Sequence, residues 1–476
     1  MSYEIEADYE QQFLFPPSLE ELIPKDDPAR FIREFVEVLD IESLGMKVRK
    51  GKDGRPNYSS KLLLRVWLYG WFDKVKSVRE LEKLCKRDIG MMWLVGMKAP
   101  DHNTLWRFYK NNKKSIKKLF KYSVKTAVDN NLVGMALHAI DGTKIRADVS
   151  DDNILKRDKL NKELKNIDAE IDKYFKEIES QTSDSQYEIE KLSEELQDQK
   201  KLRDRIKSSL NKLENQDVKY LNETDKDSRM MKTRDGIKFS YNSQAVVDSQ
   251  NSIIVGVDVV QAESDSKLMN NMIKNAKENL DNNPETTVLD AGYFSGEELA
   301  KADEKGYNVI TNIPPSSGWN INVPVESEYH QNNFAYDEKL DIYRCPKGGI
   351  LEFQRMKRNS RKNYDTKVYH CKSYKTCPHR NECSKDPRGR KIDINPYKKI
   401  IEQHKMKLTR LENKILLKKR MAIVEPVFAI IKNILCFRRF RVRGLENVHD
   451  QWNLICTIVN LRKLYKKWMI GEVKFG

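Results

Sequence analysis

Residues 132–149 read LVGMALHAIDGTKIRADV and decide the fold class of the chain. The run is apolar and strand-like, and it ends in Asp141-Gly142, a pair that often forms turns. The pattern before it is helical, and immediately after it the period changes to that of long helices. We therefore expect the first strand of an α/β sheet here, with an aspartate at its carboxyl end.

Strand signals return after residue 239. Residues 240–248 and 252–260 are separated by the turn residues 249–251, which predicts a β-hairpin. A helix around residues 268–273 then leads to a further strand, 286–292, which carries Asp290 near its carboxyl end. Two aspartates at the ends of separate strands are therefore expected at one edge of a mixed sheet.

The first 130 residues have the pattern of short helices. One helix is expected after the cap Ser59-Ser60, and a second at Ser77–Glu80, whose serine and glutamate match a capping box. A third follows residues 100–104 and carries Arg107 and Lys110. A basic last helix suits helix-turn-helix DNA binding, but an ordinary helical bundle with solvated lysines explains the same spacing.

Residues 151–222 interrupt the sheet pattern. Leucine and isoleucine recur there at steps of four and three residues, before and after a polar stretch at 181–186. This predicts an inserted antiparallel helical hairpin. Its charged outer faces favour a spacing or partner-binding role.

The composition is basic, with 87 lysine and arginine residues against 71 acidic ones and a formal net charge of +16. Such a balance agrees with a polyanionic partner but does not establish one. No apolar run approaches the roughly 18 to 20 residues that span a bilayer, and the start of the chain lacks a signal-peptide pattern. We expect a cytoplasmic protein whose seven cysteines are thiols or metal ligands, not disulfides.

A glutamate, Glu425, follows on a later helix and can join the two aspartates at the sheet edge. Paired divalent cations need hard oxygen ligands, and such a set of three carboxylates suits metal-assisted phosphoryl transfer. One aspartate alone at a strand end more often caps a turn. The three carboxylates together, and not any one of them, indicate metal-assisted phosphoryl transfer.

The sequence around these carboxylates resembles the DDE transposases of bacterial insertion sequences, and the resemblance covers nearly the whole chain except residues 151–222. The segments that carry it are Phe15–Leu19, Ser77–Glu80, Pro100–Thr104, Ala139–Thr143, Thr224–Arg229, Tyr241–Gln244, Leu289–Phe294, Ile423–Phe428 with Lys432, and Phe440–Gly444.

The resemblance implies a ribonuclease H-like catalytic domain that uses magnesium, or manganese in vitro. Asp141 would lie on its first strand, Asp290 after the fourth, and Glu425 on a C-terminal helix. Lys432, seven residues after Glu425, would lie two helical turns along the same face, where the family's lysine approaches DNA phosphate.

The chain departs from the family pattern just before the glutamate. Lys418 and Met421 stand where the family has a tyrosine and an arginine, and Arg420 lies one position early. Pro426 removes a backbone donor, so we expect the helix to start near it or to kink there.

The implied activity is that of an enzyme that binds the terminal inverted repeats of its own element, cleaves double-stranded DNA and joins the ends to target DNA. It implies a homodimer on DNA, associated with the nucleoid and not with a membrane. A decayed DNA-binding repressor and a nuclease that does not join are the alternatives. The residues expected to contact DNA are Arg107, Lys110, Arg420, Lys432, Arg438, Arg439 and Arg441.

Four cysteines, Cys345, Cys371, Cys377 and Cys383, gather in one loop-rich stretch. Their spacing is poorer than that of paired C-x-x-C motifs, so two readings stay open: a tetrahedral zinc site, in which His370 or His379 could replace a cysteine, or reduced thiols without metal. We expect a small core of Ile350, Leu351, Phe353 and Tyr369 around them, and we expect Cys85, Cys436 and Cys456 to be buried apolar residues.

At 476 residues the chain is longer than one ordinary domain. The expected parts are a helical DNA-binding domain (1–130), a first catalytic segment (131–150), the helical hairpin (151–222), a second catalytic segment (223–320), the cysteine-rich insertion (321–394) and a C-terminal helical part of the catalytic domain (395–476).

Overall fold

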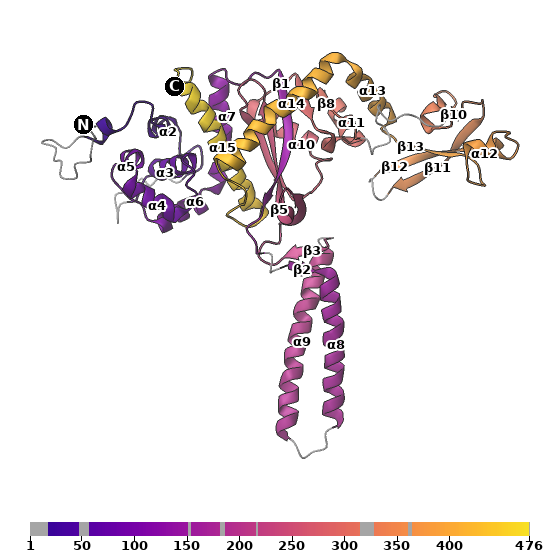
Figure 1. The fold of residues 1–476 in the computed structure, drawn as a ribbon, viewed down its shortest axis with the longest axis horizontal. Helices are drawn as coiled ribbons and strands as arrows, with labels where there is room; N and C mark the ends of the chain where they lie inside the picture. Colours follow the sequence, from indigo (N-terminus) through magenta and orange to yellow (C-terminus); the bar gives the residue numbers. More distant parts are fainter. Residues whose placement is uncertain are drawn as a thin grey trace, which may run out of the picture.

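The computed structural model in Figure 1 describes residues 18–46, 57–150, 154–180, 186–215, 218–314, 328–359 and 364–475. The start of the chain and residues 15–17 of the Phe15–Leu19 motif lie outside these ranges. A central mixed sheet connects three further parts: a group of short helices, a long helical hairpin and a second, smaller sheet. This is the expected α/β architecture, consistent with a ribonuclease H-like fold.

The central sheet has the strand order β4-β5-β1-β7-β8, with β6 also paired to β5. β5 runs antiparallel to β1, β4 and β6, whereas β1, β7 and β8 run parallel to one another. The strands are β1 (Leu137–Arg146), β4 (Arg229–Thr233), β5 (Gly236–Asp248), β6 (Ile254–Val260), β7 (Thr286–Leu289) and β8 (Val309–Thr311).

The prediction that the first strand ends at Asp141-Gly142 is wrong. β1 continues to Arg146, because its pairing with β5 runs unbroken from His138↔Asp248 to Arg146↔Ser240. Asp141 therefore lies in the middle of β1. The hairpin β5–β6 forms as expected, whereas β4 was not predicted.

Helices pack on the sheet and complete its core. Helix α14 crosses the sheet against β1 and β7 and runs through Pro426 without a break, so the expected helix start at this proline is wrong. A π-helical turn, η5, follows directly. These helices are α10 (Met269–Leu280), η1 (Ala291–Tyr293), α11 (Gly296–Glu304), α13 (Lys398–Thr409), α14 (Leu411–Ala429), η5 (Ile430–Ile434) and α15 (Leu445–Trp468).

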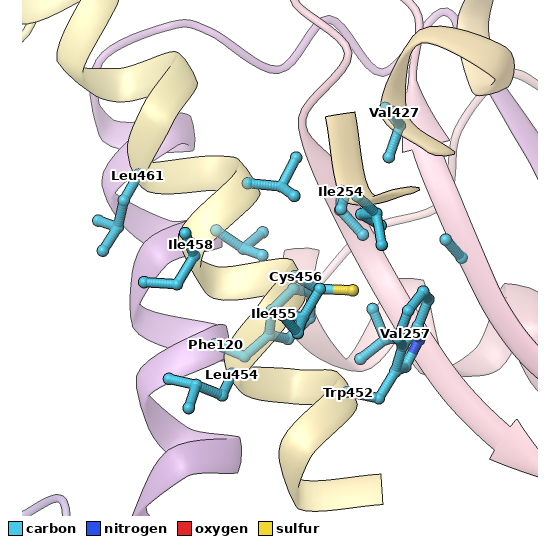
Figure 2. Packing of buried hydrophobic residues seen from close by; sticks show 14 of the residues in the cluster. Phe120, Ile254, Val257, Val427, Trp452, Leu454, Ile455, Cys456, Ile458 and Leu461 are labelled. Carbon is cyan, nitrogen blue, oxygen red and sulfur yellow. The ribbon is translucent and has the colours of Figure 1, made fainter. Parts of the chain in front are cut away.

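Helix α15 forms the centre of the largest hydrophobic core. It packs between α7 and β6, and Figure 2 shows Trp452 and Cys456 projecting from it among Ile254 and Val257 of β6. Asn460 ties the helix to the strand, since its amide donates to the carbonyl of Ile254 at 2.8 Å and its oxygen accepts from the amide of Ile254 at 2.8 Å. The N-terminal helices share this core with the sheet.

Some of the helix caps that the sequence predicts for the N-terminal region are present in the structure. Ser59 caps its helix by accepting from the amide of Leu62, and Asp101 caps another by accepting from the amide of Thr104. The capping box at Ser77 is wrong, because the Ser77 side chain makes no cap hydrogen bond. The helices are α1 (Leu19–Leu22), α2 (Pro28–Glu37), α3 (Ser60–Phe72), α4 (Val78–Arg87), α5 (Ile89–Leu94), α6 (His102–Asn111) and α7 (Lys113–Asp129).

The inserted hairpin projects away from the central sheet (Figure 1). Its two helices, α8 (Arg157–Ser180) and α9 (Gln186–Asn215), pack on each other with a core of their own. A short two-stranded sheet, β2 (Ile154–Lys156) with β3 (Tyr220–Asn222), closes the base. Leu202, which follows the heptad-like pattern, is exposed.

The cysteine-rich stretch is a five-stranded antiparallel sheet, although the sequence suggested mainly loops. Its core contains Leu351 and Tyr369 as expected, but Ile350 and Phe353 are exposed. Ile350 lies on the opposite face of β11 from Leu351, whereas the ring of Phe353 packs edge-on against Tyr369 at the border of the core. Its elements are η3 (Gln331–Asn333), β9 (Ala335–Asp337), β10 (Ile342–Arg344), β11 (Ile350–Asn359), β12 (Tyr364–Cys371), η4 (Lys372–Lys375), α12 (Arg380–Cys383) and β13 (Lys391–Ile394).

None of the helices in the described parts of the chain is long and apolar enough to cross a membrane.

Candidate active site

Asp141 and Asp290 lie level with each other on neighbouring parallel strands. Ile140 of β1 pairs in register with Leu289 of β7, so the next residue of each chain segment is one of the two aspartates. β7 ends at Leu289, whereas β1 continues past Asp141. The carboxylates are therefore close where β7 stops, and the negative charge of Asp290 contributes to raising the pKa of Asp141.

Asp141 is held by one amide and one guanidinium. Its Oδ1 accepts from the amide of Gly142 at 2.8 Å, and its Oδ2 accepts from Nη1 of Arg420 on α14 at 3.0 Å. Burial raises the pKa of the Asp141 carboxyl, while the Arg420 charge opposes this rise. Arg420, expected to contact DNA phosphate, thus lies against a candidate metal ligand in the DNA-free chain.

Asp290 also has a local structural role. Its Oδ1 accepts from the amide of Gly292 at 2.8 Å and caps the short helix η1, which is the common role of an aspartate after a strand. Its main-chain oxygen accepts from the hydroxyl of Thr311 on β8 at 2.6 Å. The carboxylate is thereby oriented beside Asp141 and keeps Oδ2 available for another ligand.

Glycine at position 142 is required by the neighbouring strand. Gly142 pairs with Gln244 of β5, and a Cβ at this position would lie 2.2 Å from Nε2 of Gln244 and 3.1 Å from Oδ1 of Asn242. These two amides are fully buried next to Asp141. The Asp-Gly pair of the sequence therefore reflects a close side-chain approach inside the sheet, not a turn.

A buried polar network lies under the two aspartates and was not predicted. Gln244 donates to Asp265 Oδ1 at 2.8 Å and to Asn242 Oδ1 at 2.8 Å, and Asn242 donates to the same Asp265 oxygen at 2.6 Å. Tyr293 donates its hydroxyl to Gln244 Oε1, and burial together with the nearby carboxylates raises the Tyr293 pKa well above its ordinary value. Lys144 Nζ lies 3.5 Å from Asp265.

The sequence does contain a signal for this network. Residues 240, 242 and 244 are polar at every second position of β5, with Ser243 a further polar residue between them, and residues two apart face the same side of a sheet. All three side chains are fully buried, whereas alternating polar residues usually face solvent. Asp265 gives no such signal, because it follows β6 in a serine-rich stretch.

Glu425 lies on the exposed side of α14, next to Pro426. Arg420 of the same helix reaches Asp141, but five residues turn an α-helix by about 140°, so Glu425 does not share the face of α14 from which Arg420 projects. Within the described ranges no three histidine, cysteine, aspartate or glutamate side chains are already grouped as metal ligands. The structure thus brings Asp141 and Asp290 together and leaves Glu425 on the adjoining helix.

Lys432 is half-buried in the π-helical turn η5. The wider turn of a π-helix breaks the seven-residue spacing that was expected to align Lys432 with Glu425. Burial and the positive charges of Arg234 and Arg438 lower the pKa of Lys432, while Asp141 opposes this change. The carbonyl of Lys432 accepts from Nε of Arg438 at 3.3 Å, so Lys432 contacts the arginine-bearing loop.

The remaining basic residues expected to contact DNA lie in two places. Arg107 and Lys110 are exposed on α6, next to the exposed ring of Trp106, which stacks on Tyr109. Arg438, Arg439 and Arg441 are exposed on the loop between η5 and α15.

The motif Thr224–Arg229 positions that loop. Asp225 accepts from the amide of Gly444 at 3.2 Å, and Asp227 accepts from the amide of Leu445 at 2.9 Å at the start of α15. Gly444 has φ of 83°, a conformation that favours glycine.

All four cysteines of the smaller sheet line one cavity of about 360 Å³, together with His379. Their thiols are free, and Cys345 Sγ accepts from the amide of Gly349 at 3.1 Å. Burial and the other three sulfur atoms raise the pKa of Cys383. His370 does not line this cavity, since its ring bonds the carbonyl of Arg388 at 2.5 Å.

The other three cysteines lie outside this cavity. Cys85 and Cys456 are buried as expected, but Cys436 is exposed, at the left-handed turn after η5.

Comparison with known families gives two matches. The family model described as "Transposase DDE domain" matches residues 344–465, which include the four cysteines, Arg420, Glu425 and Lys432. The model described as "Transposase domain (DUF772)" matches residues 17–111, the N-terminal helices. A search of curated proteins found no match. Asp141 on β1 and Asp290 directly after β7 lie between the two matched segments, and the two family matches together support a DDE transposase of insertion-sequence type.

Proposed function

We propose that this transposase binds the terminal inverted repeats of its element, cleaves them to free 3′-hydroxyls and joins these to target DNA, as at least a homodimer on nucleoid DNA. The observation that carries the proposal is the pair Asp141, on β1, and Asp290, directly after the adjacent parallel strand β7, with the helix that bears Glu425 packed against both strands. A DDE transposase domain also suggests a polynucleotidyl transferase, a class that uses divalent metal ions.

The donor set fits a magnesium site, because carboxylate oxygens are the ligands that this ion prefers. Asp141, Asp290 and Glu425 would hold the cations, which would activate the attacking hydroxyl and stabilise the leaving oxygen. Arg420 supplies a positive charge next to Asp141. With a cation held by Asp141, the Arg420 guanidinium would be free to contact a DNA phosphate.

The network of Gln244, Asn242 and Asp265 fixes the backbone beside Asp141. Its members hydrogen-bond one another inside the sheet, so their positions do not depend on DNA. Preorganised ligands are what an accurate metal site requires.

A strand-transfer assay tests the proposal. The DNA that flanks the gene supplies candidate end sequences, and labelled ends are incubated with full-length protein, target plasmid and magnesium or manganese. We expect metal-dependent cleavage and covalent joining of label to plasmid. Cleavage without joining would identify a nuclease, and binding without either reaction a decayed DNA-binding protein.

We also propose that Cys345, Cys371, Cys377 and Cys383 bind one zinc ion. Four free thiols lining one cavity, with an amide donating to one sulfur, match the chemistry of a structural zinc site, in which thiolates would draw in around the metal. The smaller sheet already has an apolar core, so the metal would stabilise the cysteine-bearing turns more than the strands.

Protein prepared without a metal-affinity tag is expected to carry about one zinc per chain by elemental analysis, since one four-thiolate site holds one ion. The double change Cys371→Ser, Cys377→Ser should remove the zinc and weaken DNA engagement, while leaving the central sheet folded. Cys436→Ser, an exposed cysteine outside this cavity, is the matched control for zinc content. Absence of zinc from wild type, with full activity in the double variant, would refute the site.

A further inference from the structure

A second cavity lies between the N-terminal helices and the loop that connects η5 to α15, away from the cysteine cavity. It has a volume of about 340 Å³ and an open mouth. Lys76, from the turn between α3 and α4, forms one wall, and its Nζ donates to the carbonyl of Leu435. The side chains that line it are Lys76, Asp148, Cys436, Phe437, Arg438, Arg439, Phe440 and Arg441.

The side chains that line this cavity carry more positive than negative charge. Asp148 is its only acidic lining residue, and it pairs with Arg439 at 3.1 Å and with Arg443 at 3.2 Å. Lys76, Arg438 and Arg441 make no ion pair with any carboxylate in the described parts of the chain. Burial and the charge of Arg441 lower the pKa of Lys76, as expected for cations held together without a counterion.

The loop that carries the arginines is fixed to the catalytic strand. The amide of Arg146 donates to the carbonyl of Arg438 at 3.3 Å, and the amide of Phe440 donates to the carbonyl of Arg146 at 2.9 Å. Arg146 ends β1, five residues after Asp141, and five residues of strand span about 17 Å. Arg438 also contacts the turn η5, since its Nε donates to the carbonyl of Lys432 at 3.3 Å.

We propose that Lys76, Arg438 and Arg441 form a pocket for a backbone phosphate of the DNA strand that enters the active site. The inference rests on the proposed function. It adds a phosphate contact shared by the N-terminal helical region, through Lys76, and the loop between η5 and α15. A phosphodiester would supply the missing negative charge and accept hydrogen bonds from both walls.

The first test measures binding of a fluorescein-labelled DNA duplex of arbitrary sequence to the full-length protein between about 50 and 200 mM salt. Lys76→Met and, from the opposite wall, Arg441→Gln should each weaken binding about tenfold at low salt. Each should also lower the slope of log affinity against log salt by about one, the value for one lost phosphate contact. Lys76→Arg should restore both quantities, which separates charge from a purely structural role.

Lys173→Gln is the matched control, because Lys173 is an exposed lysine on the hairpin helix α8. Unchanged slopes in both pocket variants, with wild-type cleavage, would overturn the pocket but leave the proposed function intact. Wild-type protein without salt-dependent DNA binding would overturn both.

Cys436 provides an independent readout, since its exposed thiol lines the same pocket. The duplex should slow its alkylation, measured by mass spectrometry, whereas inorganic phosphate at millimolar concentration should not. Equal protection by inorganic phosphate would identify a site for free anions and overturn the DNA assignment.

Discussion

Asp141→Asn, Asp290→Asn and Glu425→Gln should each reduce DNA cleavage at least about a thousandfold, since a catalytic metal ion supplies several kcal/mol to the transition state. Each substitution removes a ligating charge and keeps the size of the side chain. Binding of the DNA ends should change little, because the basic residues that neutralise phosphate remain. Gel-based cleavage with labelled ends and a parallel binding titration measure the two effects.

Asp198→Asn is the control for these variants, because Asp198 is an exposed aspartate on the hairpin helix α9. Asp141→Asn has one further consequence, since it removes the partner of Arg420. DNA binding of this variant should therefore be as tight as that of wild type, or tighter. Full cleavage by any of the three variants would exclude that residue from the site.

Trp452→Ala should lower the free energy of unfolding by about 3–5 kcal/mol, the range for removing a large buried aromatic side chain. Trp452 is fully buried in the core of α15, and its indole nitrogen donates to the carbonyl of Gln244 at 2.9 Å. The substitution leaves a cavity and an unpaired buried carbonyl in the strand that supports Asp141. Urea unfolding followed by circular dichroism measures the loss.

Trp452→Phe separates the two contributions, because it keeps most of the volume but loses the donor. A loss of about 1–3 kcal/mol is expected from the unpaired carbonyl. Equal stability of Trp452→Ala and wild type would mean that α15 does not support the sheet as described.

The sequence correctly predicts two separate strands at Asp141 and Asp290, but not where they end, since β1 continues to Arg146 and β7 ends one residue before Asp290. It does not predict the network of Gln244, Asn242 and Asp265, which depends on the pairing of strands far apart in the chain. The sequence does not distinguish a buried asparagine or glutamine side chain from an exposed one. Only the register of β1 with β5 shows why residue 142 must be glycine.

Local signals were also misleading where tertiary contacts compete with them. Ser77 precedes a helix and matches a capping pattern, yet its side chain makes no cap bond. Helix α14 continues through Pro426, although proline lacks the amide hydrogen that would bond the carbonyl of residue 422. Cys436 was expected in the core, but the left-handed turn after η5 brings it to the surface.

The inserted hairpin affects how the catalytic sheet can assemble. Strand β1 pairs with a strand far along the chain, since Arg146 pairs with Ser240. Closing such a long loop costs conformational entropy, which slows folding. The two helices contact each other locally and can form early, which brings residues 154–156 and 220–222 together as β2 and β3. After that step only short segments separate β1 from its partner. The insertion thus shortens the effective loop, and the order of folding would run from the hairpin to the sheet.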